Sequence, residues 1–177
     1  MPTKGRTDPE GVRNGWQNNA GELGDRDLKF VDALLAKIKK DFSVDDSRVY
    51  AMGHSNGGRF VYLLWAERGE QFAAFGPSGS PAVLLVRKFV PRSAFLIAGQ
   101  GDKLVSFDGQ RLTADALRRL LKTDGLKPRK DGYAAYETGP NGLELGTYFH
   151  PGGHEYPEEG AKLTIELFKR HALPGKK

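Results

Sequence analysis

The 177-residue sequence contains no cysteine. Without cysteine the chain can form neither a disulfide framework nor a thiolate metal site, and the cysteine count says nothing about its compartment. No apolar run approaches the roughly 18 residues that a membrane-spanning helix needs, and the polar, glycine-rich segment 1–25 lacks the pattern of a signal peptide. The sequence therefore predicts no membrane segment and leaves the localisation unknown.

The sequence also lacks a concentrated charge of one sign. Its 27 Lys and Arg stand against 22 Asp and Glu, which gives a formal charge of +5, and the basic residues occur in short runs beside acidic ones. Aromatic residues, which would stack on bases, do not alternate with these runs, so we expect no nucleic-acid partner. The apolar share of 38%, with 23 Gly and 10 Pro, is typical of one loop-rich globular domain.

Short apolar runs alternate along the chain with segments of helical periodicity. Leu28, Val31, Leu34, Leu35, Ile38 and Phe42 recur at helical spacing, which predicts a helix over 25–41. Further helices are expected at 56–68, 113–122 and 158–172, and strands at 48–53, 72–76, 93–98, 133–137 and 143–149. The last two strands flank Asn141-Gly142, a strong hairpin signal. The fold class predicted is α/β: a mainly parallel sheet flanked by helices, with an antiparallel hairpin at one edge.

The segment Gly53-His54-Ser55-Asn56-Gly57 fits the pattern G-x-S-x-G between a predicted strand and a predicted helix. In a nucleophile elbow the serine occupies a tight strand-to-helix turn that exposes its hydroxyl, and close backbone contacts favour glycine two residues to either side. The helix that follows would direct the backbone amide of Asn56 at a developing oxyanion. The pattern predicts Ser55 as a nucleophile and Asn56 as one oxyanion donor.

A nucleophilic serine needs a histidine base and a carboxylate that orients the base. Asp102 follows the predicted strand 93–98, whereas Asp108 is better interpreted as the cap of the next helix. His154 lies in a glycine-rich loop before the last predicted helix. Taken alone, a histidine there is more commonly bonded to backbone, but Ser55 and Asp102 precede it in the order that a triad requires. His150 and His154 are four residues apart, but Pro151-Gly152-Gly153 excludes a helical metal pair. We therefore predict Asp102 and His154 as partners of Ser55 and expect no metal.

Three segments in order, RVYAMGHSNGG (48–58), AGQGDKLVSFDGQ (98–110) and HPGGHEYP (150–157), resemble the nucleophile, acid and histidine segments of the polyhydroxybutyrate depolymerase and feruloyl esterase group of α/β-hydrolases. The resemblance assigns the catalytic roles to Ser55, Asp102 and His154 and one oxyanion amide to Asn56. It implies hydrolysis of polyhydroxyalkanoate, feruloyl or acetyl esters without a cofactor, on small or polymer-borne substrates. Members of the group are often secreted.

The resemblance does not extend to the strands that precede the nucleophile strand in that group. Only 47 residues precede Arg48, and they hold one predicted helix and a polar segment. We therefore expect residues 1–177 to form a single, N-terminally incomplete α/β-hydrolase domain without the loop that supplies the second oxyanion amide. The strand at 48–53 would then be an apolar edge able to pair with another chain.

Two other functions fit the same residues. The chain could be an inactive or partner-dependent fragment that acts as an interaction module, or an acyltransferase with the same triad. We expect four side chains to line the substrate site. Three are close in sequence to the predicted triad, and the fourth is an aromatic residue near the start of the chain. They are His54, Trp16, Phe107 and Tyr156. For each aromatic residue the alternative is that it packs in the core.

Overall fold

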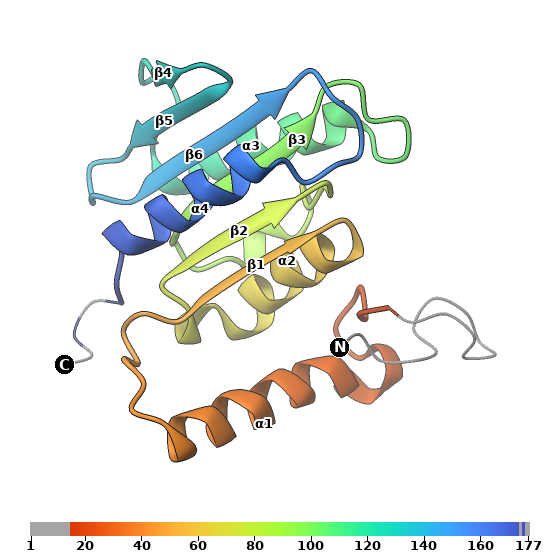
Figure 1. Ribbon diagram of the computed structural model, residues 1–177, viewed down its shortest axis with the longest axis vertical. Coiled ribbons are helices and arrows are strands. Elements are labelled where there is room, and N and C mark those ends of the chain that lie inside the picture. Colours follow the sequence, from red (N-terminus) through yellow and green to blue (C-terminus); the bar gives the residue numbers. More distant parts are fainter. Residues whose placement is uncertain (1–14, 174, 176–177) are drawn as a thin grey trace.

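The computed structural model describes residues 15–173 and 175, which form one six-stranded sheet with helices on both faces (Figure 1). The strand order is β1-β2-β3-β6-β5-β4. The strands are β1 (Tyr50–His54), β2 (Ala74–Ser78), β3 (Ser93–Gly99), β4 (Arg129–Asp131), β5 (Ala134–Thr138) and β6 (Glu144–His150). β1, β2, β3 and β6 are parallel, and β5 and β4 are antiparallel at one edge. The predicted fold class is confirmed.

Four α-helices connect and cover these strands. They are α1 (Arg26–Asp41), α2 (Asn56–Arg68), α3 (Phe107–Leu121) and α4 (Glu158–Arg170), with short 3-10 turns η1 (Glu22–Asp25), η2 (Gly69–Gln71) and η3 (Val86–Lys88). Among the described residues, no helix is long and apolar enough to cross a membrane.

The start of α3 differs from the prediction. The helix begins at Phe107, six residues before the predicted start at 113, and the Ser106 hydroxyl accepts a hydrogen bond from the Gly109 amide at 3.4 Å. Ser106 is therefore the N-cap, and Asp108 lies in the first turn of the helix. The prediction that Asp108 caps α3 is wrong. The glycine in the first turn concealed the helix start because glycine weakens helical patterns.

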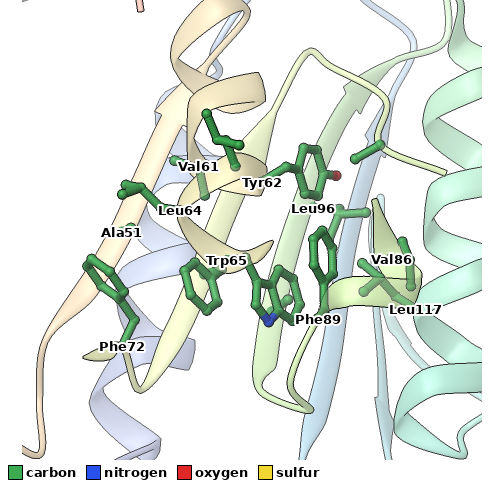
Figure 2. Close-up of a cluster of buried hydrophobic side chains, with 14 of the residues drawn as sticks. Ala51, Val61, Tyr62, Leu64, Trp65, Phe72, Val86, Phe89, Leu96 and Leu117 are labelled. Carbon is green, nitrogen blue, oxygen red and sulfur yellow. The ribbon is translucent and has the colours of Figure 1, made fainter. Parts of the chain in front are cut away.

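The alternation of side chains along the parallel strands makes two cores. Ala94 and Leu96 of β3 face the core beneath α2 and α3, whereas Phe95 and Ile97 face the core beneath α4. Figure 2 shows the first core, in which Trp65 of α2 lies among aromatic rings. The sheet is thus the middle of three layers. Because β1, β2, β3 and β6 are parallel, their carboxyl ends lie together at one end of the sheet.

The helix α1 lies beside α2 and away from the sheet (Figure 1). Leu28 is buried, but Leu34 is 42% and Phe42 is 69% exposed, so the predicted apolar face is only partly covered in the described structure. The strand β1 occupies the sheet edge opposite β4. Whether that edge pairs with another chain stays a prediction.

Candidate active site

Ser55 occupies a backbone conformation that few residues other than glycine adopt. Its φ is 56° and its ψ is −120°, between the end of β1 and the start of α2. The Ser55 amide donates to the Ser78 carbonyl at 2.8 Å, so the turn is held against the end of β2. A strained residue at a strand-to-helix turn is the geometry of a nucleophile elbow.

Two glycines make this turn possible, and they are not the pair predicted. A Cβ on Gly58 would lie 2.3 Å from the Ser78 carbonyl oxygen, and a Cβ on Gly53 would lie 2.7 Å from the Gly57 carbonyl oxygen. A Cβ on Gly57 would meet nothing within 4 Å. The prediction that the backbone leaves no room beside Gly57 is wrong, because the tight contact is between Gly58, one residue later, and β2.

Ser55, His154 and Asp102 form a continuous chain of hydrogen bonds. His154 Nε2 lies 2.8 Å from Ser55 Oγ, and His154 Nδ1 lies 2.7 Å from Asp102 Oδ2. Ser55 and His154 are 99 residues apart in the sequence. The arrangement has the geometry that general-base activation of a serine hydroxyl requires.

The Asp102 carboxylate is enclosed, with 1% of its side chain exposed. Burial opposes its ionisation, but hydrogen bonds from His154 and from the amides of Val105 and Leu104 outweigh burial and lower its pKa below the ordinary value. Asp102 is therefore ionised at neutral pH. An ionised carboxylate at Nδ1 favours the tautomer of His154 that leaves Nε2 free to accept a proton.

Backbone contacts at the end of β3 position the His154 loop. The Gln100 amide donates to the His150 carbonyl at 2.8 Å, and the Gly101 amide donates to the Gly152 carbonyl at 2.9 Å. A Cβ on Gly99 would overlap the Gly153 carbonyl oxygen, at 2.0 Å. These contacts bring the loop close to β3, the strand that precedes Asp102.

His54 lies directly beside the candidate base. Its ring centre is 4.7 Å from that of His154 and 5.7 Å from that of Tyr156, and its Nδ1 lies 3.0 Å from the Ser78 hydroxyl. Burial and the neighbouring His154 lower its pKa below the ordinary value. His54 therefore stays uncharged at neutral pH and packs against the base. Its contact with a substrate stays a prediction.

The aromatic candidates occupy different surroundings. Trp16 stacks on Phe60 with ring centres 4.6 Å apart, and its backbone NH and C=O bond to the Asn56 side chain at 2.7 and 3.1 Å. Trp16 therefore packs on α2, which is the alternative interpretation given above. Phe107 meets the ring of Phe149 edge-on at 5.2 Å. Tyr156 lies beside His54, and its role in binding, like that of Phe107, stays a prediction.

A cavity of about 200 Å³ opens beside Ser55. It is lined by Asn18, Ser55, Asn56, Arg59, Gly79, Ser80, Pro81 and Val105. Sequence reasoning missed Arg59 and Ser80. Their only signals were the position of Arg59 one helical turn after Ser55 and the Ser-Gly-Ser sequence at the end of a predicted strand. In the part of the chain that the structure describes, no cluster of three His, Cys, Asp or Glu side chains could hold a metal ion.

The fold and sequence are similar to those of known esterases. The chain is 27% identical over 169 residues to a probable feruloyl esterase C of Aspergillus niger, covering 89% of this chain and 58% of that protein. It is 36% identical over 132 residues to feruloyl esterase C of Emericella nidulans, covering 74% and 46%. It thus spans about half the length of these relatives.

The fold is also similar to that of solved esterase structures. An acetyl xylan esterase from Aspergillus awamori superimposes with a TM-score of 0.62 and 15% identity, over 80% of this chain and 66% of that one. At that identity the likeness shows the fold alone. No family model matches the chain.

The elbow makes a prediction about two neighbouring glycines. Gly58→Ala should lower the free energy of unfolding by about 1–3 kcal/mol, since its Cβ meets the backbone of β2. Gly57→Ala should not lower the free energy of unfolding, and it should raise it by up to about 1 kcal/mol because alanine favours the helix more than glycine does. Urea unfolding of both variants measures the difference. Equal stability of the two would contradict the contact assigned to Gly58.

The position of His54 predicts how stability depends on pH. The folded chain keeps His54 uncharged at pH values where the unfolded chain protonates it, below about 6.5. The unfolded state then binds more protons, so the free energy of unfolding falls as the pH is lowered from 6.5. His54→Gln should reduce this fall between about pH 5 and 6.5. Unfolding at pH 7.5, where His54 is uncharged in the folded and the unfolded state, serves as the control. If the free energy of unfolding fell equally with pH in the parent and in His54→Gln, the prediction would be rejected.

Proposed function

We propose that this chain, which has the α/β-hydrolase fold and feruloyl esterases among its relatives, is a carboxylic ester hydrolase that works through an acyl-enzyme on Ser55. The observation that carries the proposal is the hydrogen-bonded chain from Ser55 through His154 to Asp102. It joins three segments far apart in sequence and ends on a serine in a strained elbow. Packing alone gives no reason for this combination.

The proposed reaction has two halves. In the first, His154 Nε2 takes the proton of the Ser55 hydroxyl as Oγ attacks the ester carbonyl, and the same nitrogen then returns the proton to the leaving alcohol. In the second half, water attacks the acyl carbonyl as it loses a proton to His154. The acid is then released, and His154 returns that proton to Ser55 Oγ. Asp102 stays ionised throughout and stabilises the charged imidazole.

The oxyanion that forms in each half needs hydrogen-bond donors. The backbone amide of Asn56, at the N-terminus of α2, is one proposed donor, and the helix dipole adds to it. The Asn56 side chain bonds to Trp16 and Asn18, which fixes this residue in the first turn. The donor is therefore held in place before the substrate arrives, as electrostatic stabilisation requires.

The substrate class proposed follows the names of the relatives. The relatives named feruloyl esterase C point to feruloyl esters, and the resemblance of the three motifs adds acetyl esters, whether on small molecules or on polysaccharides. Polyhydroxyalkanoate esters are included because of the three motifs. Acyl transfer to an alcohol would need a site that excludes water. The cavity beside Ser55 is open, so water can reach the acyl-enzyme, and this supports hydrolysis.

Covalent labelling tests the nucleophile. A fluorophosphonate probe should label the parent chain at Ser55, because His154 lies within 2.8 Å of its hydroxyl. Ser55→Ala should abolish labelling, and Ser106→Ala, at the exposed cap of α3, should leave it unchanged. Mass spectrometry of the labelled peptide gives the site. Labelling of Ser55→Ala at the rate of the parent would reject the assignment.

A matched pair of carboxylates tests the acid. Asp102→Asn should lower kcat/KM for a short aryl ester by about 10³–10⁴-fold, because an amide stabilises the wrong tautomer of His154. Asp108→Asn makes the same change on a side chain that is 79% exposed, and it should cost less than about threefold. The reverse order of the two losses would transfer the role to Asp108.

A further inference from the structure

A second cavity adjoins the one beside Ser55. It has a volume of about 260 Å³ and is lined by Arg59 and by Pro81, Ala82, Val83, Leu84 and Leu85. Arg59 and Pro81 line both cavities, so the two hollows meet at these residues. The wall that continues from Pro81 is apolar, and Leu84 is 79% exposed on it. The combined cleft runs from the nucleophile, past a guanidinium, onto an apolar surface.

Two buried polar atoms of this cleft have no partner. The Nε of Arg59 and the hydroxyl of Ser80 are both inaccessible to solvent, and within the described residues neither makes a hydrogen bond. Ser80 as a whole is 7% exposed. Both side chains line the cavity that contains Ser55. A buried donor without a partner is unfavourable, and a ligand that accepts a hydrogen bond from it would remove that cost.

Other half-buried arginines of this chain are paired. Arg68, Arg92 and Arg118 each lie within 2.9 Å of a carboxylate oxygen, on Asp32, Glu70 and Glu137 respectively. Across residues 15–173 and 175, the structure gives Arg59 no ion pair. A positive charge that is partly removed from water gains from a counter-charge nearby. An anionic ligand would supply that counter-charge.

The side of the ester that enters the cleft follows from the proton transfers. The leaving alcohol receives its proton from His154, so it must lie on the His154 side of Ser55. Neither cavity is lined by His154 among the residues that the structure describes. Gly79, which lines the cavity beside Ser55, lies against His154, so that cavity borders the candidate base. The acyl group is assigned to the part of the cleft past Arg59, which residues 81–85 line.

We infer that this cleft is an acyl subsite, in which Arg59 and Ser80 bind a carboxylate carried by the acyl group of the substrate. The inference rests on the esterase function proposed above and narrows its substrate to half-esters of dicarboxylic acids. The hydrocarbon part of such an acyl group lies against the wall 81–85, and its carboxylate accepts hydrogen bonds from the Arg59 guanidinium and the Ser80 hydroxyl.

A binding experiment tests the subsite without turnover. In the Ser55→Ala chain, monomethyl adipate should bind at least about tenfold more tightly than dimethyl adipate, which has the same length and no charge. Adding Arg59→Met should remove this preference, and Arg59→Lys should retain part of it. Arg87→Met, which removes a charge at an exposed position of η3, should leave the preference intact. Equal affinities for the two esters in Ser55→Ala would overturn the inference.

Kinetics separate carboxylate binding from oxyanion stabilisation by Arg59. The 4-nitrophenyl half-ester of adipic acid is compared with 4-nitrophenyl hexanoate, and Arg59→Met should lower the ratio of their kcat/KM values at least about tenfold. An equal loss for both esters would overturn the inference, since the guanidinium would then act on the oxyanion. Selective binding of the half-ester by a parent chain that hydrolyses neither ester would support the subsite and reject the proposed esterase function.

Discussion

The contact between the start of α2 and the end of β2 is the constraint on which the candidate site depends. Gly58 lies so close to the Ser78 backbone that a methyl group would not fit between them. The Ser55 amide donates to the same residue, so the serine is held in its strained conformation by backbone alone. The Ser78 hydroxyl also lies 3.0 Å from His54, the neighbour of the candidate base. Ser78 therefore holds the nucleophile through its backbone and the neighbour of the base through its side chain.

The same device recurs where β3 ends. Gly99 and Gly153 approach more closely than any Cβ would allow, and the amide of Gly101 bonds to the carbonyl of Gly152. The loop bearing His154 is thus tied to the strand that precedes Asp102. Backbone hydrogen bonds and glycine contacts hold the site, and side-chain packing in the two cores holds the sheet that they rest on. Such a site keeps its geometry when surface side chains change.

Sequence patterns predicted the parallel strands, the ends of α2, and the three residues Ser55, Asp102 and His154 that hydrogen bonds join. These features have a regular hydrophobic period or a fixed spacing in the sequence. The patterns failed where the deciding contact is tertiary. The strand β4 consists of three exposed residues with no apolar period. Nothing local distinguishes Gly57 from Gly58, and only the approach of β2 gives them different roles. Trp16 near the start of the chain gave no sign that it would stack on Phe60.

The two charges beside Ser55 differ in how the chain satisfies them. Asp102 is buried and fully bonded: His154 and two backbone amides neutralise the cost of enclosing its carboxylate. Arg59 shares the site but lacks such a shell within the described structure, and the adjacent Ser80 hydroxyl is also unpartnered. A charge that serves stability alone gains from an internal partner, as Arg118 does with Glu137. An unmatched charge next to a nucleophile has a physical reason when its partner arrives with the substrate, because the free energy of pairing then contributes to binding.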